Sequence, residues 1–136
     1  MAGFTVNPKC PYHGGSFDGD IVGQMEDGTN GIIEIKCPFD PVKHIQNLNL
    51  SRSGLDVKHE YYGQIQSNIE TAGAHWCDFV SFDPRQDEKH RLVIIRVFRD
   101  EIYIKAMMDR IHQGKRILDR YLAGESMEKA IFNSKQ

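Results

Sequence analysis

Gly31-Ile-Ile-Glu-Ile-Lys-Cys-Pro38 combines an apolar run with charges at alternate positions, a pattern that predicts a central strand of the fold. Successive side chains of a strand point to opposite faces, so Glu34 and Lys36 share one face while the apolar residues around them share the other. Pro38 ends the run. A buried strand with one charged face indicates a functional site.

A hairpin is expected to join this strand to the one before it. The sequence predicts two strands, over residues 16–23 and 30–37. The Asp-Gly pair ending at Gly28 is a strong hairpin signal, because glycine adopts positive φ without strain. With a three-residue loop ending at Gly28, Asp20 lies opposite Glu34 and Asp18 opposite Lys36, all on one face. A slip of one residue would turn both aspartates away, so this register is a testable prediction.

The rest of the chain predicts a mixed sheet with helices packed on it. The expected elements are a short helix near 42–48, an amphipathic helix over 57–72, strands over 76–82 and 91–99, and a long helix over 100–122. Asp40 is placed to cap the first helix and Gly73 to close the second. The strand over 91–99 is too continuously apolar for an exposed edge, so it is expected inside the sheet. The fold class is therefore α/β (α+β), with a central mixed sheet flanked by helices.

Composition limits the class of protein. The chain has 136 residues, of which 40% are hydrophobic and 26% charged, as expected for one globular domain. That domain, 1–136, would comprise an extended lead-in over 1–15, a core over 16–99, and a helix with a polar tail over 100–136. Neither a membrane span nor a signal peptide is evident, so a cytoplasmic protein, in the host cell if phage-encoded, with no membrane partner is expected.

Cysteine usage and charge add two further expectations. Three cysteines without a Cys-x-x-Cys pair predict reduced thiols and no zinc site. The net charge of −2 argues weakly against a nucleic-acid partner, yet residues 85–120 hold ten Lys and Arg against six acids. Because acids around a metal offset basic residues elsewhere, net charge does not exclude phosphate binding.

Two carboxylates and a lysine on neighbouring strands are the groups that a metal-dependent phosphodiesterase requires. Asp18, Glu34 and the backbone carbonyl of Ile35 are the expected ligands of Mg²⁺, which prefers hard oxygen donors, and Mn²⁺ is expected to substitute. Lys36 can orient the attacking water and, if nearby cations favour its neutral form, accept the proton of that water, which an arginine could not do because it stays protonated. The alternative is an ordinary Glu-Lys pair on a strand surface, which is common and weak.

Four ordered motifs resemble those of phage lambda exonuclease and its YqaJ-type viral recombinase relatives, within the PD-(D/E)XK nuclease superfamily. They are Ser16-Phe-Asp-Gly19, Gly31-Ile-Ile-Glu-Ile-Lys-Cys-Pro38, Tyr61-Tyr-Gly-Gln-Ile-Gln66 and Trp76-Cys-Asp-Phe-Val-Ser-Phe-Asp-Pro-Arg85. The resemblance extends from about Gly3 to Arg99. Four motifs in order are far more specific than any one of them.

This resemblance implies roles for the carboxylates. Asp18 matches the aspartate of the family's Ser-Pro-Asp-Gly motif, and Glu34 with Lys36 matches its Glu-x-Lys. Phe17 stands where the motif has proline. Asp20 is an additional aspartate that could displace or assist Asp18 at the metal.

The resemblance also implies roles on the helix and the turn that follow. Gln64 matches a glutamine beside the family's active site, and Tyr61, one helical turn earlier, is a DNA-binding candidate. Gln66 is a weaker DNA-binding candidate. Arg85 matches the arginine of an Asp-Pro-Arg turn, where a phosphate contact and a structural role are equally open.

The implied function is a Mg²⁺-dependent deoxyribonuclease, a 5′-to-3′ exonuclease on double-stranded DNA ends in phage-type recombination. Two alternatives remain, an endonuclease or nickase on the same fold and a catalytically weak DNA-binding or assembly module. The resemblance further implies a ring-shaped homotrimer and a single-strand annealing protein as partner. The family's N-terminal helical region, with a further glutamate and an arginine for the 5′ phosphate, is not matched, which leaves a trimmed chain, a minimal nuclease or a contribution from a partner chain.

Overall fold

The computed structural model describes residues 3–21 and 26–136. It divides into two units, Met1–Arg99 and Asp100–Gln136. The first unit contains β1 (Thr5–Val6), β2 (Gly14–Gly15), β3 (Gly19–Ile21), β4 (Gly31–Lys36), α1 (Pro41–Ser53), α2 (Tyr62–Ala72), β5 (Trp76–Phe82) and β6 (Leu92–Phe98). The second contains α3 (Glu101–Leu122) and α4 (Met127–Ser134). The boundary falls where the sequence separates the core from the C-terminal helix, and a single nuclease domain over 1–136 stays a prediction.

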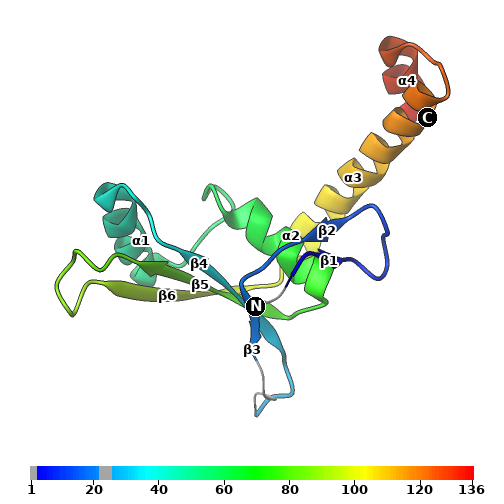
Figure 1. Ribbon diagram of the computed structural model, residues 1–136. Coiled ribbons are helices and arrows are strands. Elements are labelled where there is room, and N and C mark those ends of the chain that lie inside the picture. The colour runs from blue at the N-terminus through cyan, green and yellow to red at the C-terminus, as the bar shows by residue number, and fades with distance from the viewer. Residues whose placement is uncertain (1–2, 22–25) are drawn as a thin grey trace. The chain divides into compact units, whose positions relative to one another are not determined.

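A four-stranded mixed sheet forms the centre of the first unit (Figure 1). Its strand order is β3-β4-β5-β6, with β3 antiparallel to β4, β4 parallel to β5 and β5 antiparallel to β6. The parallel pair requires a crossover connection, and α1 and α2 supply it. β1 and β2 form a separate two-stranded sheet. The predicted mixed sheet with helices is confirmed.

Both crossover helices cover the same face of the sheet. Glu34 is paired with Phe79 and Lys36 with Ser81, so these four side chains share a face. Helix α2 reaches this face at Glu34, and α1 reaches it at Ser81. The face carrying the charges is therefore the covered one, whereas Ile35 on the opposite face is 45% exposed.

The predicted register of the β3–β4 hairpin was wrong by two residues. Asp20 pairs with Ile32 instead of Glu34. A shift of two preserves the alternation of side chains, so both aspartates keep their parity relative to Glu34. Asp18 now lies beside Ile33–Ile35 instead of Lys36, because its backbone N–H donates to the carbonyl of Ile33 at 3.1 Å.

The residues just before β4 contact the residues at the start of β5. Gly28 has φ of +75°, as the hairpin signal required. Thr29, however, accepts the indole N–H of Trp76 at 3.1 Å, and the backbone N–H of Asn30 donates to His75 at 3.2 Å. Both residues are therefore engaged by the start of β5 and do not extend β4. The predicted strand residues 22–23 and loop residues 24–25 lie outside the described residues.

Three other predicted elements need correction. Helix α1 is longer than predicted and ends only at Gly54, because no residue before that glycine, at φ of +78°, breaks it. Helix α2 begins at Tyr62 instead of residue 57, since residues 57–61 form turns. Strand β6 is an edge strand: its buried positions alternate with exposed ones, so its continuous apolar sequence does not reflect burial on both faces.

Several predicted caps are confirmed. The Asp40 carboxylate accepts the N–H of Val42 at 2.9 Å at the start of α1. Gly73 closes α2 at φ of +63°. Strand β5 has the predicted limits, Trp76–Phe82.

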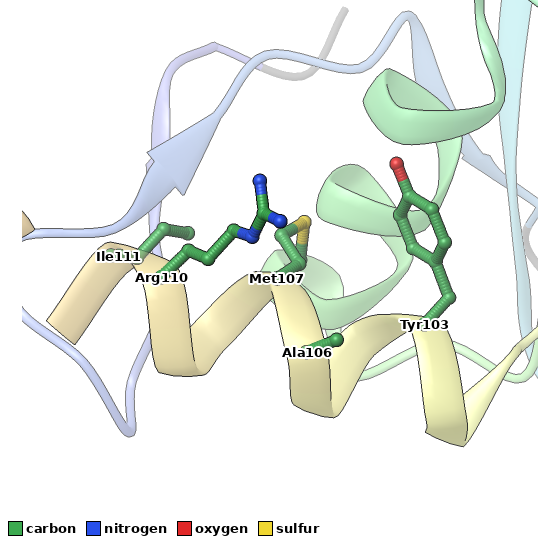
Figure 2. A pocket seen from close by; sticks show the side chains of 5 residues that line it. All are labelled: Tyr103, Ala106, Met107, Arg110 and Ile111. Atoms are coloured by element: carbon green, nitrogen blue, oxygen red, sulfur yellow. The ribbon is translucent and has the colours of Figure 1, made fainter. Parts of the chain in front are cut away.

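The unit Asp100–Gln136 is a pair of helices in contact with each other. Asp100 caps α3 by accepting the N–H of Tyr103 at 2.9 Å. Figure 2 shows side chains of α3 that line a pocket, Tyr103, Ala106, Met107, Arg110 and Ile111. Within the predicted polar tail, Ser126 caps a second helix, α4. Among the described residues, no helix is long and apolar enough to span a membrane.

Candidate active site

Glu34 is a buried carboxylate at the centre of the covered face. Its exposed fraction is 3%. Lys36 Nζ and Gln64 Nε2 donate to Oε1 at 2.7 and 2.8 Å, and Asn68 Nδ2 donates to Oε2 at 3.3 Å. A buried charge is tolerated only when it is paired and hydrogen-bonded, and these contacts meet that requirement. Each carboxylate oxygen accepts about two bonds, so Oε2 retains acceptor capacity.

Lys36 is held from three sides. Its Nζ donates to Glu34 and, at 3.3 Å, to Gln64 Oε1. The same nitrogen lies 4.7 Å from the centre of the Tyr61 ring, within the range of a cation–π contact. The side chain remains 22% exposed. Lys36 is therefore both fixed in direction and accessible from solvent.

Asp18 joins the same site through the backbone of β4. Its Oδ2 accepts the N–H of Ile35 at 2.6 Å. In a strand, the N–H and C=O of one residue point to the same side, so the Ile35 carbonyl also faces the side where β3 has not yet begun. The carboxylate of Asp18 and the carbonyl of Ile35 thus lie at one edge of β4, next to Glu34.

Helix α2 supplies two amides to the site, of which the sequence analysis identified only one. Gln64 and Asn68 are four residues apart, so they occupy one side of the helix. Asn68 is 4% exposed and also donates to the Ser16 carbonyl at 3.4 Å. Gly15 makes room for it, since a Cβ there would lie 2.3 Å from Asn68 Oδ1. The four-residue spacing from Gln64 was the signal that could have revealed Asn68.

The donor set of this site fits a hard divalent cation. Asp18, Glu34 and the Ile35 carbonyl present only oxygen atoms, which Mg²⁺ prefers over nitrogen or sulfur. In the ranges 3–21 and 26–136, no three His, Cys, Asp or Glu side chains come together as a metal site. Two carboxylates and a carbonyl would leave positions for water and phosphate. Asp20 is exposed on β3, and its role as a further ligand stays a prediction.

Two of the predicted DNA-binding residues have structural partners. Gln66 is fully buried and donates to the Phe98 carbonyl at 2.9 Å, so it joins α2 to β6 and its placement contradicts a DNA contact. Arg85 pairs with Asp83 at 2.7 Å and donates to the Pro38 carbonyl at 3.2 Å. The structural role of Arg85 is therefore present, and its phosphate contact stays a prediction.

Two solved structures are similar to this chain. The crystal structure of an alkaline exonuclease (LHK-Exo) from Laribacter hongkongensis has a TM-score of 0.63 and 30% identity, over 90% of this chain and 61% of that one. The structure of LHK-Exo in complex with dAMP has a TM-score of 0.62 and 31% identity, over 89% and 60% of the respective chains. This chain therefore spans about three fifths of the length of these solved relatives.

No curated protein sequence matches the chain. A family model, described as the YqaJ-like viral recombinase domain, matches residues 1–75, which is more than half of the chain. The matched region contains Asp18, Glu34, Lys36 and Gln64. The chain therefore belongs to the YqaJ-like viral recombinase domain family.

Proposed function

We propose that this chain carries the catalytic site of a Mg²⁺-dependent deoxyribonuclease of the PD-(D/E)XK type. It hydrolyses phosphodiester bonds at the ends of double-stranded DNA, in the 5′-to-3′ direction. The observation that carries the proposal is the meeting of Asp18 with the backbone of Ile35 beside a buried Glu34, which itself anchors Lys36. A surface Glu-Lys pair would need neither the burial nor the amides of α2.

Each residue of the site has a definite task in this proposal. Asp18, Glu34 and the carbonyl of Ile35 would hold the metal. When bound, Mg²⁺ supplies a water that is nucleophilic at neutral pH and relieves the charge on the phosphate. Lys36 Nζ, fixed by Glu34 and Gln64, orients that water and takes part in its deprotonation. The water oxygen bonds to phosphorus as the bond to the leaving oxygen breaks, and the leaving oxygen takes up a proton from solvent.

DNA as substrate is supported by the solved relatives, and its double-stranded form by the resemblance of the sequence motifs to the lambda exonuclease family. The similar solved protein is an alkaline exonuclease, and one of its structures holds dAMP, a deoxynucleoside monophosphate. That chemistry suits a site whose donors are arranged for a phosphate and a metal. Tyr61, whose ring contacts Lys36, is the DNA-binding candidate nearest to the reacting groups. The ring-shaped homotrimer and the annealing partner stay predictions.

The decisive experiment compares DNA substrates and metals. Linear duplex with 5′-phosphate or 5′-hydroxyl ends, and closed circular DNA, are incubated with Mg²⁺ or with a chelator. The proteins are the wild type, Lys36→Ala and the matched control Lys43→Ala, which removes an exposed lysine paired with Glu60 at 3.5 Å. The exonuclease digests only linear DNA, faster from phosphorylated ends, and only with metal.

Each outcome decides between the candidate functions. Lys36→Ala should abolish digestion while Lys43→Ala retains it. Nicked circles would indicate an endonuclease on the same fold. DNA binding without any metal-dependent product would leave a binding or assembly module and exclude both enzymes.

A further inference from the structure

Tyr61, which contacts Lys36 through its ring, is itself positioned by a histidine. Tyr61 is the N-cap residue of α2 and makes no capping bond with its side chain. Its backbone N–H donates to Nδ1 of His59 at 3.2 Å, and the N–H of Tyr62 donates to the His59 carbonyl at 3.0 Å. The imidazole and the Tyr61 ring are 5.7 Å apart between centres. His59 therefore fixes both the start of α2 and the ring that faces Lys36.

Phe79 supports both of these rings from the sheet. Its ring centre lies 5.7 Å from that of Tyr61 and 5.8 Å from that of His59. Phe79 is fully buried and is the direct partner of Glu34 across the β4–β5 ladder. Phe79 thus packs against both rings from β5, the strand next to the one that carries Glu34.

A chain of hydrogen bonds continues from His59 through the interior. His59 Nε2 bonds to Asn47 Oδ1 at 3.4 Å, and Asn47 Nδ2 donates to Ser81 Oγ at 3.1 Å. Ser81 Oγ bonds to His44 Nδ1 at 2.9 Å, and His44 Nε2 bonds to the His90 carbonyl at 2.7 Å. The side chains of Asn47, Ser81 and His44 are buried. The chain connects α1 and β5 to the residue that positions Tyr61.

The partners at the far end of this chain fix its direction. A carbonyl only accepts, so His44 donates from Nε2 to His90 and its Nδ1 accepts the hydroxyl proton of Ser81. The Ser81 oxygen then accepts from the amide of Asn47. Each hydrogen bond in this series therefore has one donor and one acceptor.

The partners at the near end give the same result. The backbone N–H of Tyr61 only donates, so Nδ1 of His59 is the acceptor and Nε2 carries the proton that goes to Asn47. An imidazolium has no acceptor nitrogen and could not hold this bond. Burial lowers the pKa of His59, against the raising effect of the negative charges of Glu60 and Asp56. The neutral imidazole with its proton on Nε2 satisfies every contact.

From this geometry we propose that His59 is a positioning residue for the nuclease reaction, which acts on Lys36 through Tyr61. The inference rests on the proposed nuclease function. Among the described residues, the side-chain hydrogen bonds of His59 go to Asn47 and Tyr61, and none goes to Asp18, Glu34 or Ile35. By accepting the N–H of Tyr61 it fixes the ring that confines Lys36 Nζ beside Glu34 and Gln64.

Two substitutions test the roles of the two imidazole nitrogens of His59 separately. His59→Asn places an amide oxygen near the position of Nδ1, where it can accept the N–H two residues on, as asparagine does in turns. His59→Gln places its polar group near Nε2 and leaves the N–H of Tyr61 without that acceptor. His75→Gln is the matched control, because His75 Nδ1 also lies within hydrogen-bond distance of a backbone N–H, that of Asn30 at 3.2 Å, and of the Asn30 side-chain oxygen at 2.6 Å.

The expected result is a loss of turnover rather than of DNA affinity. His59→Gln should lower kcat about tenfold with little change in KM, because small displacements of a reacting group are costly. His59→Asn should restore most of kcat, and His75→Gln should leave it unchanged. In a Tyr61→Ala background, His59→Gln should have no further effect, since His59 acts through Tyr61.

A second readout does not depend on catalysis. The side-chain protons of Lys36 lie near the Tyr61 ring and carry its ring-current shift in the NMR spectrum, where Lys36→Met identifies them by their loss. His59→Gln should move these resonances toward those of a free lysine, and His59→Asn should keep them near the wild-type positions. This measurement tests the positioning of Lys36 by His59 even if the wild type hydrolyses no DNA. Absence of hydrolysis would overturn only the proposed nuclease function.

Two results would overturn the positioning role. One is a Lys36 resonance that His59→Gln leaves in place. The other is equal loss of kcat in His59→Asn and His59→Gln in step with a fall in thermal stability, which would mean that the residue only supports the fold.

Discussion

Glu34 brings together the groups that the proposed chemistry needs, and its burial makes its partners matter for stability as well. An exposed fraction of 3% leaves little solvent to stabilise the negative charge. Lys36 supplies the opposing charge at 2.7 Å, and the amides of Gln64 and Asn68 supply donors. Removing one partner of a buried pair costs far more than removing an exposed pair, because the other charge stays desolvated.

Lys36→Met should therefore destabilise the fold as well as stop the reaction. Lys36 is partly exposed, so the expected loss is about 1–3 kcal/mol in the free energy of unfolding, below the full cost of breaking a buried pair. Urea denaturation measures it. Lys43→Met, which removes the partner of exposed Glu60, should cost about 0–1 kcal/mol. Equal losses in the two variants would contradict the role of burial.

The three free cysteines should differ sharply in reactivity. Cys37 is exposed, whereas Cys10 and Cys77 are buried. Burial, with the negative charges of Glu34 and Asp78, raises the pKa of the Cys77 thiol to about 12. Because the thiolate is the reactive form, one thiol per native chain should react with a disulfide reagent at pH 8, and three after denaturation. Rapid native labelling at Cys77, identified by mass spectrometry, would refute this.

At the scale of elements, the sheet is organised by a close contact between β4 and β5. Gly31 is paired with Trp76, and the Trp76 ring occupies the space where a Cβ of residue 31 would stand. The guanidinium of Arg96 lies 3.6 Å from the centre of that ring, and Arg96 also pairs with Asp78. Only glycine therefore fits at the start of β4, because the Trp76 ring fills the space that a side chain would need.

Gly31→Ala should destabilise the first unit. Its Cβ would lie 2.2–2.4 Å from atoms of the Trp76 ring, so strand or ring must move. Overpacking of this kind costs about 1–3 kcal/mol, which thermal or urea unfolding detects. Gly114→Ala is the contrasting variant, since a Cβ in the middle of α3 meets nothing within 4 Å. It should stabilise its own helix by about 0.5–1 kcal/mol. The same sign for both variants would contradict the close contact at Gly31.

At the scale of the whole molecule, a cluster of hydrogen bonds joins three strands of the first unit at one end. The carboxylate of Asp83 accepts from Arg85 and Gln86, and its backbone N–H donates to the Arg91 carbonyl at 2.9 Å. Arg85 in turn donates to the carbonyl of Pro38, just after β4. This cluster joins the ends of β4 and β5 to the start of β6.

The stability of the unit Met1–Arg99 should therefore depend on the ionisation of Asp83. The hydrogen bonds from Arg85 hold the pKa of that carboxyl below its usual range. Its unfolded pKa is about 3.9, so the contribution is fully present above that value and is lost as the pH falls below it. Asp83→Asn should be less stable than wild type at pH 7 and should lose less stability between pH 4 and pH 2. Chemical denaturation at each pH measures this, and parallel curves for the two proteins would contradict it.

Local patterns alone predicted most of the elements. The alternation around Glu34 and Lys36 predicted β4, Asp40 predicted the start of α1, and Gly73 predicted the end of α2. These signals depend on one residue and its near neighbours, through φ, capping bonds and side-chain parity. Parity also explains why the two-residue error in the hairpin register left Asp18 associated with the site.

Which groups meet in the site depends on packing between distant parts of the chain. The contact of Asp18 with the Ile35 amide, the donation from Asn68 to Glu34 and the path from His59 to His44 all join residues that the local pattern leaves independent. The edge position of β6 and the burial of the charged face under α2 also depend on strand order and helix placement. Strand parity, helix caps and turn glycines could be read from the amino-acid sequence, because they follow from local backbone geometry. The convergence of the site groups required packing across the sheet, which local sequence does not encode.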